Sequence, residues 1–221
     1  FDGGAQDLFA LQEQVAEGTA RALSLKLTAE ERRGLAARPT THFEAYDDYL
    51  RGRIIYASLS RRENEQARAL YRRAIEKDPR FALAYAGLAQ TYIDDFRGGG
   101  NKDKAVTAAE AGRLAERALA LDKELPQAHF ASGYVDLYGL GDHAAAIAKA
   151  RRALELNPNF ADAYALLASA YFFAGELDKI FDLDQEAMRL NPAASFLYHV
   201  HLGRRDYLEG RYREALDTFL I

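Results

Sequence analysis

The chain has 221 residues, of which 28% are charged and 49% hydrophobic, and its formal net charge is −4 at pH 7. It has no cysteine, which excludes a disulfide framework, a thiolate metal site and a cysteine nucleophile. The slight acidic excess, with no basic run longer than a pair, argues against a nucleic-acid partner, and the longest apolar stretch, residues 163–174, is too short for membrane insertion.

The N-terminal segment predicts two helices. Apolar residues recur every three or four positions over about 7–27, which predicts a helix with one apolar face. These residues are Leu8, Leu11, Val15, Thr19 and Leu23. Thr28-Ala-Glu-Glu31 is a capping box that starts a short helix ending before Pro39. We expect residues 1–41 to form a helical cap or linker for the rest of the chain.

Residues 42–221 repeat one pattern of small and aromatic residues. A second capping box, Thr41-His-Phe-Glu44, opens the first copy. The complete copy lies between Pro158 and Pro192, which are 34 residues apart, and reads Tyr164, Leu167, Ala168, Tyr171, Gly175, Ile180, Ala187 and Pro192. Partial copies carry Tyr49, Gly52, Ala67, Tyr71, Ala74 and Pro79 first, then Tyr85, Leu88, Ala89, Ala111, Ala115 and Ala118, then His129, Gly133, Gly141, Ala146, Ala153 and Pro158, and finally Leu202, Gly203, Gly210, Ala215 and Phe219.

This period and residue order resemble the tetratricopeptide repeat (TPR) over roughly residues 42–221. The resemblance implies an all-α, right-handed superhelical solenoid of about five helix-turn-helix units, which holds other molecules in its concave face. Since a full fifth unit would run past Ile221, we expect the last unit to be truncated. An irregular helical bundle is the alternative, and repetition at a fixed period disfavours it.

The first fifty residues carry a second resemblance. The strings at 7–15, 25–31 and 44–52 are similar to the junction in bacterial multidomain signalling proteins. In those proteins a TPR tail follows a nucleotide cyclase, a kinase, a winged-helix regulator or a TolB-like module. The resemblance implies that this chain is an interaction tail whose catalytic or DNA-binding module lies upstream.

In TPR structures, fixed positions on the first helix of each unit line the concave groove. The residues we select at these positions are Tyr49, Arg53, Tyr56, Gln90, Phe130, Tyr134, Tyr138, Ser169, Phe172, Phe173, Arg204 and Tyr207. Asp94 and Asp162 occupy further groove positions. The groove positions have no Lys or Asn with which TPR chaperone adaptors clamp a C-terminal carboxylate, so we reject that mode.

An aromatic groove suits an amphipathic helix or an extended apolar peptide, and Arg53 and Arg204 could meet acidic residues of such a partner. Two other interpretations stay open. Aromatic residues at helical spacing are often core, so part of this set can be buried between units. The groove can also be filled by the helix over 7–27 or by a second copy, which would make the protein a homodimer.

No pattern predicts chemistry. Gly98-Gly-Gly-Asn-Lys102 lacks the spacing of a phosphate loop and is better interpreted as a flexible insertion between helices. His199 and His201 would point about 200° apart on a helix, so they cannot hold one metal ion. We predict no catalysis, no cofactor and no metal.

The sequence thus predicts a protein-protein interaction scaffold that binds a helical or extended apolar segment. The alternative is a regulatory domain of a larger signalling enzyme or transcription regulator, with its groove filled by its own chain or a second copy. We expect a cytoplasmic location. A periplasmic one stays open because the sequence starts Phe-Asp-Gly-Gly, which is not a native start.

Overall fold

The computed structural model describes residues 14–15, 18–19, 21–22, 39–56, 61–97, 103–192 and 195–219. Within these ranges the chain is helical and has no β-strand. The helices are α3 (Phe43–Tyr56), α4 (Arg61–Lys77), α5 (Ala82–Arg97), α6 (Lys104–Leu121), α7 (Pro126–Val135), α8 (His143–Leu156), α9 (Ala161–Ala174), α10 (Ile180–Leu190), α11 (Ser195–Leu208) and α12 (Tyr212–Phe219). A π-helical turn, η1 (Asp136–Leu140), continues α7, and a 3-10 turn, η2 (Leu177–Lys179), precedes α10.

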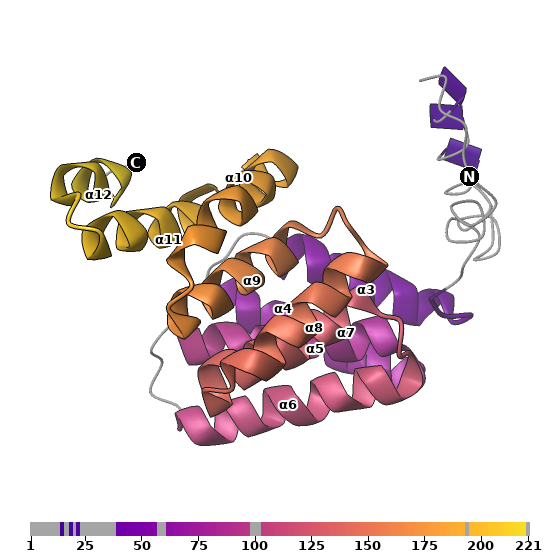
Figure 1. The fold of residues 1–221 in the computed structure, drawn as a ribbon. Helices are drawn as coiled ribbons and strands as arrows, with labels where there is room; N and C mark the ends of the chain where they lie inside the picture. Colours follow the sequence, from indigo (N-terminus) through magenta and orange to yellow (C-terminus); the bar gives the residue numbers. More distant parts are fainter. Residues whose placement is uncertain are drawn as a thin grey trace.

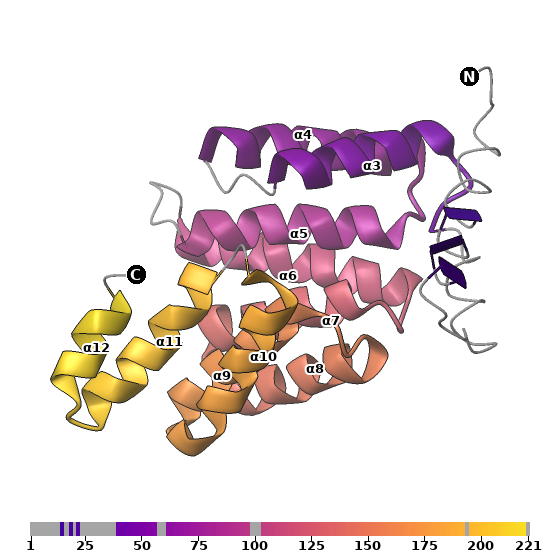
Figure 2. The same cartoon turned by 90° about the horizontal axis from the view of Figure 1, so that it is seen from above.

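The described helices form five successive pairs, α3–α4, α5–α6, α7–α8, α9–α10 and α11–α12. Each pair also packs on the next, because the second helix of one contacts the first helix of the following pair. Figures 1 and 2 show these pairs as a stack that runs from α3 to α12. The all-α repeat fold expected from the sequence is confirmed.

The small residues of the pattern let helices approach closely around a buried aromatic ring. Tyr71 on α4 is 2% exposed and lies between α3 and α5. A Cβ built on Gly52 would stand 2.8 Å from Tyr71 Cε1, and one built on Gly87 would stand 2.9 Å from the same atom. Only glycine leaves room for the ring at both positions, so these two residues set the spacing of the first two units.

Glycines also end the first helix in the last three units. Gly141, Gly175 and Gly210 have φ of 69°, 79° and 78°, the left-handed region that favours glycine at a helix C-terminus. In the third unit the spacing differs. His129 and Gly141 are 12 residues apart, whereas Tyr164 and Gly175 are 11 apart. The π-helical turn η1 accommodates this extra residue, which is a common effect of a single insertion in a helix.

The segment before the repeats is described only in part. Residues 14–15, 18–19 and 21–22 are helical, as the predicted helix over 7–27 requires, and the Thr19 hydroxyl donates to the Val15 carbonyl over 2.8 Å. Val15 is nevertheless 59% exposed, so the stripe is not buried at this position. The rest of the expected cap, the helix after Thr28 and the insertion at 98–102 lie outside the described residues.

The chain enters the first unit through Thr40, the neighbour of the expected cap Thr41. The Thr40 hydroxyl accepts from the His42 amide over 3.1 Å and donates to Asp78 Oδ2 over 2.5 Å. Thr40 is 4% exposed. The contact fastens the start of α3 to the turn after α4, because Asp78 directly follows that helix.

Candidate functional site

The predicted groove residues lie on the first helices of the units, which are α3, α5, α7 with its continuation η1, α9 and α11. The structure divides these residues by exposure. The buried ones are Tyr49, Phe130, Tyr134 and Ser169, the half-buried ones are Tyr56, Gln90, Tyr138 and Phe172, and the exposed ones are Arg53, Phe173, Arg204 and Tyr207. The buried members form part of the core, as the alternative interpretation of such aromatic residues expects.

Two buried members are covered in the same way. The Tyr49 ring meets Phe81, with centroids 5.1 Å apart, and the Phe130 ring meets Phe160, with centroids 5.4 Å apart. Phe81 and Phe160 each directly precede the first helix of the following unit. Stacking of the next unit therefore closes these groove positions.

Partly exposed rings form a continuous row across the third to fifth units. Tyr134 and Tyr138 have ring centroids 4.5 Å apart, and Tyr138 meets Phe173 edge to face at 5.7 Å. Phe172 and Phe173 also meet edge to face, at 5.4 Å. The Arg204 guanidinium of α11 lies over the Phe172 ring, 5.8 Å from its centroid. We call Tyr138, Phe172, Phe173 and Arg204 the aromatic row.

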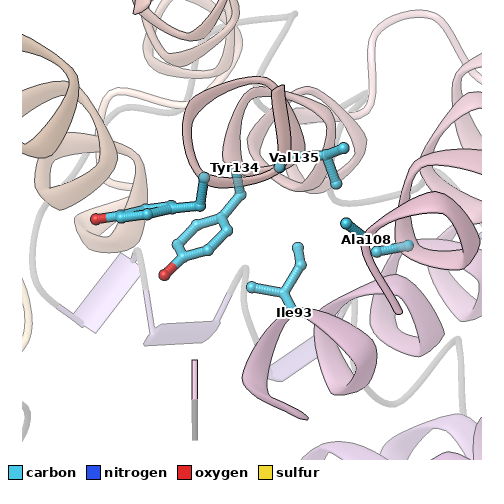
Figure 3. A pocket seen from close by; sticks show the side chains of 7 residues that line it. Ile93, Ala108, Tyr134 and Val135 are labelled. Atoms are coloured by element: carbon cyan, nitrogen blue, oxygen red, sulfur yellow. The ribbon is translucent and has the colours of Figure 1, made fainter. Parts of the chain in front are cut away.

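A small apolar hollow lies beside this row (Figure 3). Its volume is about 190 Å³, including space open to solvent. It lies among α5, α6 and α7 with η1, and its lining residues are Ile93, Ala108, Ala111, Tyr134, Val135, Tyr138 and Gly139. Small-molecule sites usually measure about 300–1,000 Å³. Since part of the 190 Å³ is open solvent, the enclosed space is smaller still and cannot hold a whole small-molecule ligand.

A polar cluster borders the aromatic residues at the end of α3. The Tyr56 hydroxyl donates to the Asp94 carboxylate of α5. Burial raises the pKa of Tyr56 well above its ordinary value, and the charges of Asp94 and Asp162 raise it further. The hydrogen bond between Gln90 and Tyr56 lowers this pKa, but by less than burial and Asp94 raise it. Side chains of the first and second units thus meet here, and Tyr56 stays a neutral donor at physiological pH.

One buried polar network was missed by the sequence analysis. Arg68 of α4 donates through Nη2 to the Thr91 carbonyl and to Asp95 Oδ2 of α5, both over 2.8 Å. Asn64, one turn earlier, donates to the same carbonyl over 2.9 Å. The i, i+4 spacing of Asn64 and Arg68, beside the pattern residues Ala67 and Tyr71, could have revealed it. The network is structural, since the Arg68 and Asn64 donors are satisfied between two helices.

Neither a cluster of metal-ligating residues nor a membrane span is present among the residues whose side chains the structure describes. Among those residues, no group of three or more His, Cys, Asp or Glu could hold a metal ion. The side chains of His199 and His201 lie outside this set. Within the same part of the chain, no helix is long and apolar enough to span a bilayer.

Comparisons with known proteins agree with this architecture. A family model described as Tetratricopeptide repeat matches residues 137–179. A protein of Rhizobium meliloti (strain 1021) named "Putative adenylate cyclase 3" is 32% identical over 130 residues. That match covers 59% of this chain and only 22% of the relative. The solved structure of Pseudomonas aeruginosa pilF has a TM-score of 0.57 at 22% identity, covering 82% of this chain and 78% of that one.

At 22% identity, the likeness to pilF shows the fold alone. The fold, the period of 34 residues between Pro158 and Pro192 and the family match over residues 137–179 point the same way. The chain therefore contains a tetratricopeptide repeat at residues 137–179, within an all-α helical repeat fold.

Proposed function

We propose that the chain binds a helical or extended apolar segment of a protein partner on the face formed by its first helices. The aromatic row carries this proposal, because its four side chains come from three successive units and touch one another in sequence. Phe173 remains 44% exposed within it. Aromatic and arginine side chains held rigidly by neighbours are the residue types that dominate binding energy at interfaces.

In this proposal the exposed and the buried residues of the predicted groove have different roles. Phe173, Arg204, Tyr207 and Arg53 are exposed and would contact the partner directly. Tyr49, Phe130, Tyr134 and Ser169 are buried and would support them from below. The hollow beside Tyr138 would take one apolar side chain of the bound segment.

The test uses two phenylalanines of matched exposure on different helices. Phe173 on α9 is 44% exposed and belongs to the aromatic row, whereas Phe181 on α10 is 46% exposed and lies on a second helix. Peptides that bind the chain would be selected from a random library, and their affinities measured by calorimetry. Phe173→Ala should weaken binding by roughly thirtyfold, equivalent to about 2 kcal/mol. Phe181→Ala should change it by less than about twofold. Equal effects of the two changes would contradict the proposal.

The comparison with the Rhizobium meliloti protein favours a second candidate. Because the match takes in only 22% of that protein, the repeats can be one region of a larger signalling enzyme or transcription regulator. The inner face would then hold a segment of the same polypeptide or a second copy and so control the output module. In that case Phe173→Ala should change the output activity of the full-length protein, and library peptides should compete with the internal segment. An unchanged output would exclude this candidate.

A further inference from the structure

A second surface, away from the predicted groove, combines tyrosine and arginine side chains of the first two units. Figure 2 shows α5 between α4 and α6, and both of these helices pack on it. The half-buried Tyr85 and Tyr92 are seven residues apart on α5, so they lie on the same side of the helix, about 10 Å apart along it. Tyr92 is two residues from the groove residue Gln90, which places the two about 200° apart around α5. Tyr92 therefore lies on the side of α5 that faces away from the predicted groove.

One arginine is held at each of these tyrosines. The Arg72 guanidinium of α4 donates to the Tyr92 hydroxyl over 2.6 Å. The Arg117 guanidinium of α6 lies over the Tyr85 ring, 5.8 Å from its centroid. Both arginines are exposed, and neither forms an ion pair with any residue in the described part of the chain. We call Arg72 and Arg117 the outer arginines.

The acidic residue beside the outer arginines is already engaged by another cation. Glu110 of α6 accepts from Nε and Nη2 of Arg113 over 2.9 and 2.7 Å. Hydrogen bonding to Arg113 lowers the pKa of Glu110, and the charges of Arg113 and Arg72 act in the same direction. Arg113 and Arg117 are four residues apart on α6, where like charges repel each other. Among the described residues, the outer arginines therefore remain as unbalanced positive charges.

The third and fourth units repeat this chemistry with one difference. Arg151 of α8 donates to the Tyr171 hydroxyl of α9 over 2.5 Å, as Arg72 does to the tyrosine of α5. The arginine of the following helix, Arg189 of α10, is instead held by Glu186 through hydrogen bonds of 2.8 and 2.6 Å. Within the described residues, only Arg151 of these two arginines is left without an ion pair. This second arrangement is a natural control for the first.

We propose that the outer arginines bind an acidic segment of a protein partner, with one carboxylate at Arg72 and a second at Arg117. Arginine suits this role because its planar guanidinium donates two parallel hydrogen bonds to a carboxylate. The Tyr92 hydroxyl accepts from Arg72 and donates to no described residue, so its own proton is available to the same carboxylate. The site does not include the aromatic row, so the inference does not rest on the proposed function.

Fluorescence anisotropy of a labelled hexaglutamate peptide at low ionic strength tests the site on the whole chain. An extended acidic chain with about three residues per turn presents carboxylates about 9 Å apart on one side, close to the spacing of the two tyrosines. Arg72→Gln and Arg117→Gln should each weaken binding by at least about fivefold. Arg151→Gln removes the same contact with a tyrosine hydroxyl and should change binding by less than about twofold. Phe173→Ala should leave it unchanged, which separates this site from the aromatic row.

A variant that gains affinity distinguishes a lost contact from a lost fold. Glu110→Gln releases Arg113 beside the outer arginines, so it should tighten hexaglutamate binding by at least about threefold. The control is Glu214→Gln on α12, because Glu214 is exposed and the substitution changes the net charge of the chain by the same amount. This control should change binding by less than about twofold.

Four results would overturn the proposal. The first is no binding of hexaglutamate at millimolar concentration. The second is an equal loss from Arg151→Gln and Arg72→Gln, and the third is an equal gain from Glu110→Gln and Glu214→Gln, since either would indicate attraction to positive charge in general. The fourth is a thymidine hexanucleotide that binds more tightly than hexaglutamate and is weakened by the same variants, which would assign the outer arginines to phosphate groups.

Discussion

Replacing Gly87 with alanine tests the close packing of the first two units. The new Cβ would stand 2.9 Å from both Cε1 and Cζ of Tyr71, well inside the roughly 3.5–4.0 Å of favourable carbon contact. The ring cannot move away freely, because Gly52 faces it with room for no Cβ either. Overpacking of this kind costs about 1–3 kcal/mol. Alanine regains about 1 kcal/mol of helix propensity, and since the ring is held on both sides we expect a net loss of about 1–2 kcal/mol.

Gly112→Ala is the matched control, since Gly112 lies inside α6 and its Cβ would meet only Val135 Cγ1, at an ordinary 3.5 Å. It should stabilise the fold by about 0.5–1 kcal/mol. Thermal unfolding followed by circular dichroism should show Gly87→Ala lowering Tm by about 3–6 °C and Gly112→Ala raising it. Tyr71→Leu combined with Gly87→Ala should cost less than the sum of the single changes. If Gly87→Ala were as stable as Gly112→Ala, or the double variant additive, the reasoning would be refuted.

Two further predictions concern buried polar groups. Arg68→Leu should destabilise the chain by about 3 kcal/mol, because the Asp95 carboxylate would lose its buried charged partner. Arg152→Leu, which removes an exposed pair with Glu155, should cost less than about 1 kcal/mol in urea unfolding. Equal losses of stability in these two variants would show that burial of the ion pair does not determine its contribution. Burial also raises the pKa of Tyr49, Tyr56 and Tyr71 above 10. The unfolded chain therefore loses these protons first, and stability should fall as pH rises above about 10. Tyr71→Phe should flatten that decline, and an unchanged slope would contradict the assigned cause.

The fold could be predicted from the sequence because each pattern residue acts locally. Gly175 and Gly210 end helices by adopting positive φ. The Tyr71 ring requires glycine at the two positions that face it, Gly52 and Gly87. Recurrence of these local requirements at one period determines the stack. Even the irregular π turn has a sequence cause, the extra residue between His129 and Gly141. The sequence analysis did not use that spacing.

The candidate site could be predicted only in part. The pattern identifies which helix a residue belongs to and its approximate direction, but exposure depends on neighbouring units. Phe172 and Phe173 are adjacent in sequence, yet one is half-buried and the other exposed. Tyr49 and Phe130 are closed by Phe81 and Phe160, which come from the following units. The depth of each groove position is therefore a result of stacking.

Site-specific photocrosslinking in the source cell tests most directly whether the first helices form the binding face. A photoreactive phenylalanine analogue would replace Phe173 in one variant and Phe181 in another, since the two have nearly equal exposure. We predict that position 173 crosslinks to a distinct protein species and that position 181 does not. Crosslinking of that species from position 181 alone, or equally from both positions, would contradict the account.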